Sequence, residues 1–161
     1  YTSVACGILL AERRDAFPDG LDQLVFRERY LPEGLPLDDP RKADIRLGHL
    51  LAMSSGFREG NVGFVDGVLR TLPPLLTARP RDPLDLDRNA MTLPLWTTPG
   101  GGYSYSSLST HAASMVLRRV AGLELQQYLE AKLARPLGWG EWGYALHRPG
   151  WVRGFIGRGG G

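Results

Sequence analysis

The sequence predicts a mostly α-helical protein. Several segments repeat apolar residues at helical spacing, and few segments alternate apolar and polar residues at the period of two that marks a β-strand. The 161 residues fit a single domain, residues 1–161, and the 43% hydrophobic and 22% charged fractions are typical of globular proteins. Because 21 glycines and 12 prolines accompany these helical segments, we expect many turns and loops between the helices.

The N-terminal half is predicted to hold two helices joined by an extended connector. The first helix covers residues 1–14, with Ser3 as its N-cap and an apolar face made by Val4, Ile8 and Leu9. Prolines at positions 18, 32, 36 and 40 predict turns and extended chain over residues 17–42. A second helix is expected in IRLGHLLAM, residues 45–53, with Asp44 as its cap.

The C-terminal half contains the clearest helix signal. No regular structure is predicted for residues 57–98, because six prolines between positions 73 and 99 indicate a long surface loop. A helix then follows with Gly122 as its stop, and its apolar residues at helical spacing are Leu108, Ala112, Met115, Val116 and Val120. One more helix is expected over residues 124–134, and the tail RGFIGRGGG is expected to form no packed element.

Charge and cysteine content argue against several classes of function. The formal net charge is +2, with 19 basic and 17 acidic residues spread along the chain, so no basic face predicts nucleic-acid binding. Cys6 is the single cysteine, which excludes an internal disulfide and a cysteine metal cluster. No apolar run approaches the roughly 18 residues of a membrane span. The residues from Tyr1 onward do not show the charged start and apolar stretch of a signal peptide, so none is expected in this chain. The sequence predicts neither localisation nor oligomeric state.

Five short motifs occur in a distinctive order along the chain. They are YLPE at 30–33, IRLGHLLAMSSG at 45–56, PGGGYSYSS at 99–107, MVLRRVAG at 115–122 and YLEAKLARPLG at 128–138. Their order and spacing resemble the serine β-lactamase-related family, which includes class C β-lactamases, DD-peptidases and esterases of the same fold. The resemblance implies a single partial domain, truncated at both ends. This domain would be the helical lobe of that α+β, transpeptidase-like fold, with most sheet strands absent.

The resemblance also implies acyl transfer through a serine ester. Ser3 would attack an ester or amide carbonyl of a β-lactam, a peptidoglycan peptide or a small ester. Tyr105 matches the tyrosine of the family's Y-x-N motif, which helps to move the serine proton. Ser107 stands where the family commonly has asparagine, and its hydroxyl can hydrogen-bond a substrate amide. The expected partner is therefore a small-molecule or peptide acyl substrate, and no cofactor is expected.

One departure from the family pattern concerns the lysine of the S-x-x-K motif, which is replaced here by Cys6. A tyrosine, with an ordinary pKa of ~10, needs nearby positive charge to act as a base near neutral pH, and a thiol does not supply it. Neither Lys42 nor Lys132 lies near Ser3 in sequence. An internal deletion between Ala5 and Cys6 would explain both the missing lysine and the short first helix. We therefore expect a fragment with impaired activity.

Other interpretations of the same residues stay open at the level of sequence. The chain can be a non-catalytic, degenerate homologue that binds a ligand or has no role. Ser3 can be an ordinary helix cap, and Tyr105 a half-buried tyrosine with a hydrogen-bonded tip.

Cys6 as the nucleophile is disfavoured, because no histidine base is near it in sequence. The G-x-G-x-x-G pattern at 138–143 has no strand before it. Metal binding is not expected, because the three histidines are far apart: His49, His111 and His147.

Overall fold

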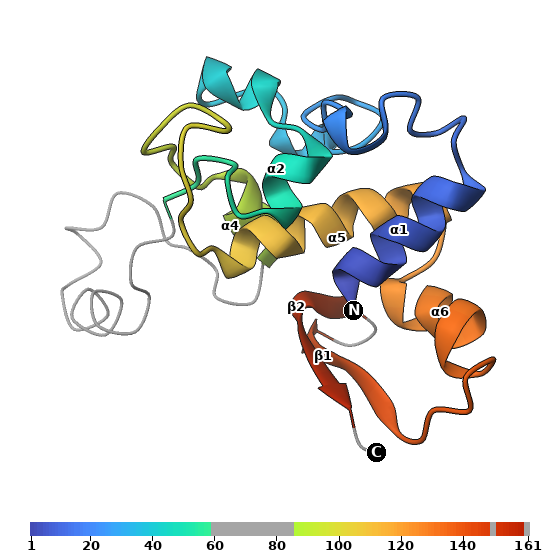
Figure 1. Cartoon of the computed structure of the whole chain (residues 1–161). Coiled ribbons are helices and arrows are strands. Elements are labelled where there is room, and N and C mark those ends of the chain that lie inside the picture. Colours follow the sequence, from blue (N-terminus) through green and yellow to red (C-terminus); the bar gives the residue numbers. More distant parts are fainter. Residues whose placement is uncertain (59–85, 149–150, 160–161) are drawn as a thin grey trace, which may run out of the picture.

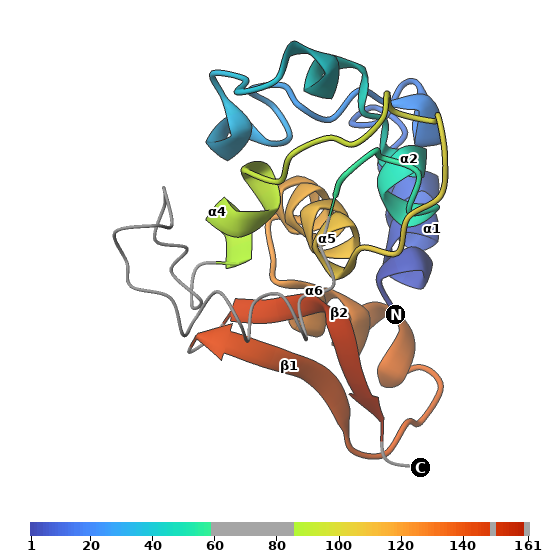
Figure 2. The same ribbon diagram turned by 90° about the vertical axis from the view of Figure 1, so that its left-hand side faces the viewer.

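The computed structural model describes residues 1–58, 86–148 and 151–159, with side chains described up to residue 144. Its helices are α1 (Thr2–Glu12), α2 (Leu47–Leu51), α4 (Leu86–Met91), α5 (Ser107–Ala121) and α6 (Leu125–Leu129), and its strands are β1 (Trp142–Arg148) and β2 (Trp151–Gly159). Helix α5 lies at the centre and contacts α1, α2, α4, α6 and β2 (Figures 1 and 2). The described residues are mainly helix and loop, as the sequence predicts. The prediction of no regular structure for residues 57–98 is wrong at α4, and residues 59–85 lie outside the described residues.

The central helix α5 follows the sequence prediction closely. Its N-cap is Ser106, whose hydroxyl accepts a hydrogen bond from the Ser109 amide at 3.0 Å. Its C-cap is Gly122, which adopts the left-handed conformation (φ 70°) that glycine favours at helix ends. The predicted apolar side chains are buried or pack against the core, and the fully buried ones are Ala112, Met115 and Val116.

Helix α1 differs from its prediction at the cap and at the buried face. Tyr1 is the N-cap, so the prediction of Ser3 as the cap is wrong, and Ser3 lies inside the first turn. Val4 is 46% exposed rather than part of the core. The buried residues of α1 are Thr2, Ala5, Cys6 and Leu9. Ala5 and Cys6 have small side chains, which allow α1 to pack closely on the neighbouring helices, and this packing decides which face is buried.

The connector and α2 are held together by backbone pairing. The connector contains three 3-10 turns, at Gly20–Asp22, Pro32–Gly34 and Pro40–Asp44, in agreement with its predicted turns. Asp44 belongs to the last turn, so its predicted role as the cap of α2 is wrong, and Arg46 is the N-cap. Residues 45–47 pair with residues 23–25 through two backbone hydrogen bonds. This pairing keeps residues 45 and 46 extended and delays the start of α2.

The last helical segment covers residues 125–134, in agreement with the predicted helix over 124–134, and is followed by a β-hairpin. Helix α6 continues into a π-helical turn, Glu130–Ala134. Strands β1 and β2 are antiparallel, with Trp142 opposite Gly159 and Leu146 opposite Val152. The prediction of an unpacked glycine-rich tail is therefore wrong. Strands pair through backbone N–H and C=O groups, and every residue except proline supplies both. The strands can therefore pair even though apolar and polar side chains do not alternate regularly along them.

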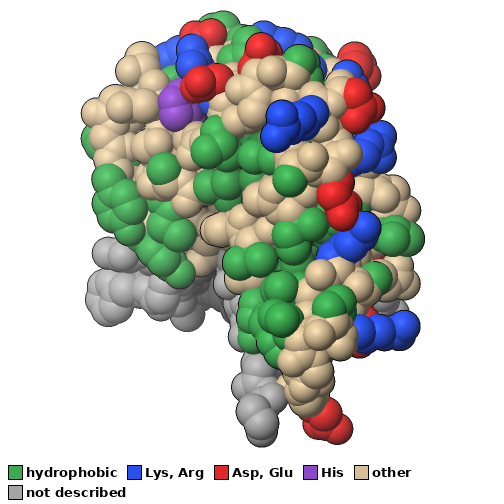
Figure 3. Space-filling model, turned by 45° about the vertical axis from the view of Figure 1, so that its right-hand side comes forward, with side chains coloured by type: hydrophobic (Ala, Val, Ile, Leu, Met, Phe, Trp, Pro, Cys, Tyr) green, Lys and Arg blue, Asp and Glu red, His purple; other side chains and the backbone are tan. Residues whose placement is uncertain are grey.

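The surface of the molecule carries charges of both signs. In Figure 3, Lys and Arg alternate with Asp and Glu along the upper and right-hand parts, whereas hydrophobic side chains gather toward the left-hand edge and the lower centre. None of the helices in the described ranges combines the length and apolar character needed to cross a membrane.

Candidate functional site

The first turn of α1 presents Ser3 to solvent. The Ala5 amide donates a hydrogen bond of 2.9 Å to the carbonyl of the N-cap Tyr1, and Ser3 lies in the first turn, where backbone amides point out of the helix end. The Ser3 side chain is exposed, and none of the described hydrogen bonds involves its hydroxyl. This hydroxyl therefore lies at the positive end of the helix dipole, where developing negative charge is favoured.

Cys6 lies one helical turn after Ser3 and faces the core. It is 1% exposed, and burial raises the pKa of its thiol to about 11. The thiol is therefore neutral near pH 7 and supplies no charge to the first turn of α1. Both lysines of the chain are engaged elsewhere: Lys132 Nζ lies 2.8 Å from Glu12 Oε1, and Lys42 Nζ lies 2.7 Å from Asp38 Oδ1.

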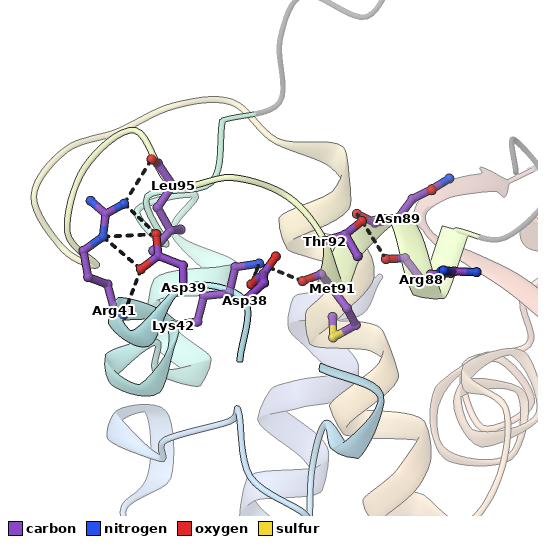
Figure 4. A network of polar contacts seen from close by, with 9 residues as sticks. All are labelled: Asp38, Asp39, Arg41, Lys42, Arg88, Asn89, Met91, Thr92 and Leu95. Carbon is purple, nitrogen blue, oxygen red and sulfur yellow. Dashed lines mark hydrogen bonds and ion pairs between the residues drawn. The ribbon is translucent and has the colours of Figure 1, made fainter. Parts of the chain in front are cut away.

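The buried Lys42 anchors the chain that leads to the glycine loop (Figure 4). Its ammonium group donates a hydrogen bond of 2.8 Å to the Met91 carbonyl in addition to its ion pair with Asp38. Nearby, Arg41 forms an ion pair with Asp39 at 2.6 Å and reaches the Leu95 carbonyl at 3.4 Å. Two cations of the connector therefore fix residues 91–95, directly before the loop.

The glycines of the PGGG segment allow close backbone packing. Gly100 has φ 81°, which residues with a Cβ rarely adopt, and its amide donates to the Ser54 carbonyl at 2.8 Å. At Gly101 a Cβ would lie 2.7 Å from Thr97 Oγ1 and 3.0 Å from the Thr98 carbonyl oxygen. The loop is therefore folded tightly on itself and against the chain that follows α2.

Tyr105 and Ser107 lie together where this loop enters α5. Tyr105 is 65% exposed, and the Ser107 hydroxyl donates a hydrogen bond of 3.4 Å to the Tyr105 phenol oxygen. Ser107 is the first residue of α5, so the helix cap fixes its backbone. No hydrogen bond between described residues joins Ser3 to either of them. The structure thus brings two of the three predicted catalytic residues together, and the role of each stays a prediction.

A buried polar cluster that sequence reasoning missed lies between α4 and α5. Asp87 Oδ1 lies 2.8 Å from His111 Nε2, and Asp87 Oδ2 forms an ion pair with Arg118 Nη2 at 2.6 Å. Burial alone would raise the pKa of Asp87, but the hydrogen bonds from His111 and Arg118 lower it well below its usual range. His111 is fully buried in this cluster. The sequence does carry a signal for this cluster. His111 and Arg118 lie two turns apart on one face of a helix, and a histidine buried on that face needs a polar partner.

The described residues form no group of three or more His, Cys, Asp or Glu side chains that could hold a metal ion. The chemistry that the candidate site offers is that of hydroxyl groups: an exposed serine at a helix start, and a tyrosine and a serine that share a hydrogen bond.

Two kinds of comparison with known proteins found similar proteins: one with a family model and one with solved structures. The family model named Beta-lactamase matches residues 1–157. The fold is similar to a D-stereospecific amidohydrolase from a Streptomyces species, with TM-score 0.61, 20% identity, and coverage of 88% of this chain and 42% of that one. It is also similar to a candidate beta-lactamase from Bacteroides dorei DSM 17855, with TM-score 0.59, 20% identity, and coverage of 98% and 43%.

A third similar structure is the D-amino acid amidase from Ochrobactrum anthropi SV3, with TM-score 0.51, 20% identity, and coverage of 88% of this chain and 38% of that one. The chain thus spans less than half the length of each of these solved structures. At these identities the likeness is one of fold. No curated protein matches the sequence.

Proposed function

This chain belongs to the beta-lactamase family, and we propose that it is a serine hydrolase of that family in which Ser3 is the nucleophile. The match of the family model over residues 1–157 is the observation that carries this proposal. We further propose that residues 1–161 form one partial domain, corresponding to the helical lobe of the family fold.

The proposed reaction passes through an acyl-enzyme. Ser3 Oγ forms a bond to the carbonyl carbon of an ester or amide while its proton moves toward the Tyr105 oxygen. The alcohol or amine leaves with this proton, and water then cleaves the serine ester, which releases the carboxylic acid and restores the Ser3 hydroxyl. Ser107 would hold the Tyr105 hydroxyl or a substrate amide, which is consistent with the hydrogen bond between the two side chains. The exposure of Ser3 supports this role, because a carbonyl group can reach its hydroxyl.

The same residues support impaired turnover. A tyrosine removes the serine proton near neutral pH only with help from nearby positive charge. Cys6 is neutral and buried, and Lys42 and Lys132 are paired with carboxylates elsewhere. These observations also favour a second candidate function, in which the chain binds an acyl ligand without hydrolysing it.

Covalent labelling separates the two functions. The purified chain is incubated with a fluorophosphonate and, separately, with a penicillin, and its intact mass is measured beside Ser3→Ala. Any adduct on the wild type that is absent from Ser3→Ala would establish Ser3 as the nucleophile. We expect slow and incomplete labelling by the fluorophosphonate. A wild-type chain that stays unlabelled while folded by circular dichroism would refute the hydrolase proposal and leave the binding function. The variant Ser104→Ala, which changes a serine of the glycine loop, is the control for nonspecific labelling.

A further inference from the structure

Two exposed aromatic side chains lie in the segment that leads into α5. Trp96 is 47% exposed and Tyr103 is 69% exposed, and both belong to the segment that ends at Tyr105. Together with Met53 they form what is called here the aromatic surface. Exposed tryptophan and tyrosine side chains that cluster on one loop are typical of binding sites, because each ring offers a large apolar area.

Each ring of the aromatic surface has a defined contact with the neighbouring chain. The Trp96 indole lies against the backbone of Gly102, where a Cβ would come within 2.9 Å of Trp96 Cη2. The Tyr103 hydroxyl lies 3.8 Å from Met53 Sδ, as donor to the sulfur, and the Ser104 amide donates to the Met53 carbonyl at 3.0 Å. A ring that is already ordered loses little conformational freedom when a ligand binds to it.

Met53 shows a second sign of a functional position. Its φ of 55° lies in the left-handed region, where it is the one residue other than glycine among the described residues. Such a backbone conformation costs on the order of 1 kcal/mol or more and persists where the surrounding contacts require it. Here it directs both the sulfur and the carbonyl of Met53 toward residues 103 and 104.

The chemistry around this surface favours an uncharged ligand. The chain from residue 89 to residue 117 contains no Lys, Arg, Asp or Glu. The described charges that reach this segment beside Trp96 are those of Arg41, at the Leu95 carbonyl, and of its partner Asp39, and these two side chains form an ion pair with each other at 2.6 Å. An anionic or cationic ligand group would have to compete with this ion pair for its countercharge, whereas a neutral ring over the aromatic side chains would not.

We propose that Trp96, Tyr103 and Met53 bind a neutral aromatic or large apolar side group of the ester or amide substrate. The proposal rests on the proposed function, since it places the substrate's side group beside Tyr105. It assigns to this chain a preference among acyl substrates for those with a neutral aromatic group.

The experiment measures binding without turnover, in the Ser3→Ala background, by ligand-detected NMR titration. The probes are N-acetylphenylalanine amide, N-acetylalanine amide and N-acetyllysine amide. We expect the aromatic probe to bind at least ~5-fold more tightly than the alanine probe. Trp96→Ala and Tyr103→Ala should each remove most of this difference. Trp139→Phe, an aromatic substitution in the cluster around Tyr1, is the matched control and should preserve it.

Three results would overturn the proposal: equal binding of the aromatic and alanine probes, tighter binding of the lysine probe, or an equal loss in Trp139→Phe. Two substitutions are used so that a folding defect in one leaves the other informative, and circular dichroism establishes that each variant is folded. Because Ser3 is absent from the protein tested, binding is measured independently of covalent labelling. If the wild type is not labelled but Ser3→Ala binds the aromatic probe more tightly, the hydrolase proposal is refuted and the proposal of an aromatic binding site is supported.

Discussion

Cys6 is the residue whose environment most changes the interpretation of the sequence. Its pKa in the folded chain is about 11, against 9.0 for an ordinary thiol, because it is buried. The unfolded chain therefore releases the thiol proton at lower pH than the folded chain. The stability that this difference represents is fully present below pH 9 and is lost as pH rises toward 11.

We therefore predict that the free energy of unfolding of the wild type falls by about 2–3 kcal/mol relative to Cys6→Ala between pH 9 and pH 11. Urea unfolding at several pH values measures this difference. Tyrosines such as Tyr144, whose pKa burial raises to about 12, titrate in both proteins, so their contribution cancels. Parallel pH curves for the two proteins would contradict the prediction.

Restoring the family lysine at position 6 tests whether a single replacement explains its loss. Because Cys6 is 1% exposed, Cys6→Lys would place an amine in the core. We predict that it lowers the free energy of unfolding by about 3 kcal/mol or more and does not increase labelling of Ser3. Gly7→Lys, at the exposed neighbouring position, is the control and should change stability little. A stable Cys6→Lys protein with increased labelling would argue against the internal deletion.

At the scale of elements, the glycine loop depends on the absence of side chains. Gly101→Ala places a Cβ 2.7 Å from Thr97 Oγ1, so we predict a loss of about 1–3 kcal/mol of stability. Gly7→Ala is the matched control, because a Cβ there meets nothing within 4 Å and alanine favours the helix by about 0.5–1 kcal/mol. Urea unfolding of both variants measures the two effects. A Gly101→Ala protein as stable as the wild type would show that the loop can relax around the methyl group.

Helices α4 and α5 are joined by the Asp87 cluster. Asp87→Asn removes the charge that His111 and Arg118 face, and we predict a loss of about 3 kcal/mol near pH 7. The pKa of Asp87 is lowered in the folded chain, so this stabilisation is present above its unfolded pKa of about 4 and is lost at lower pH. Wild type and variant should therefore converge in acid when unfolding is followed as a function of pH.

Asp22→Asn is the control for this cluster, because the ion pair of Asp22 with Arg46 lies on the surface. Surface pairs contribute little to stability, so this variant should unfold almost as the wild type does. Equal losses in the two variants would mean that burial does not strengthen the Asp87 contacts.

Elements that are encoded locally could be predicted from the sequence, and elements that depend on distant partners could not. The apolar period of α5 and the stop at Gly122 are local, and both predictions are confirmed. The start of α2 and the buried face of α1 were mispredicted, because pairing with residues 23–25 and packing on neighbouring helices decide them. Tyr105 and Ser107 could be placed together because they are two residues apart in sequence. Tyr105 precedes the N-cap Ser106, and Ser107 begins α5.

The whole molecule contains contacts between residues far apart in sequence, for which a local pattern indicates at most one of the two partners. Asp87 meets His111 across 24 positions, and the Tyr144 hydroxyl lies 3.3 Å from Thr2 Oγ1 across 142 positions. The β-hairpin was missed for another reason: its two strands are neighbours in sequence, but the alternation of apolar and polar side chains in them is interrupted. Two strands alone are marginally stable in water, so this hairpin depends on its attachment to the helices.

Trp142 is one of the residues that attach the hairpin to the helical part of the chain. Its indole nitrogen donates to Glu130 Oε2 at 2.7 Å, and its ring lies 5.4 Å from the Tyr1 ring and 5.6 Å from the Trp139 ring, between centroids. We predict that Trp142→Ala speeds amide hydrogen exchange in β1 and β2 at least ~10-fold and leaves exchange in α5 unchanged, because the hairpin can open without unfolding the helices. Leu137→Ala, at a position 62% exposed, is the control and should not affect the hairpin. If exchange accelerates equally in α5 and in the strands, the hairpin and the helices unfold as one cooperative unit, and the aromatic cluster then stabilises the whole molecule.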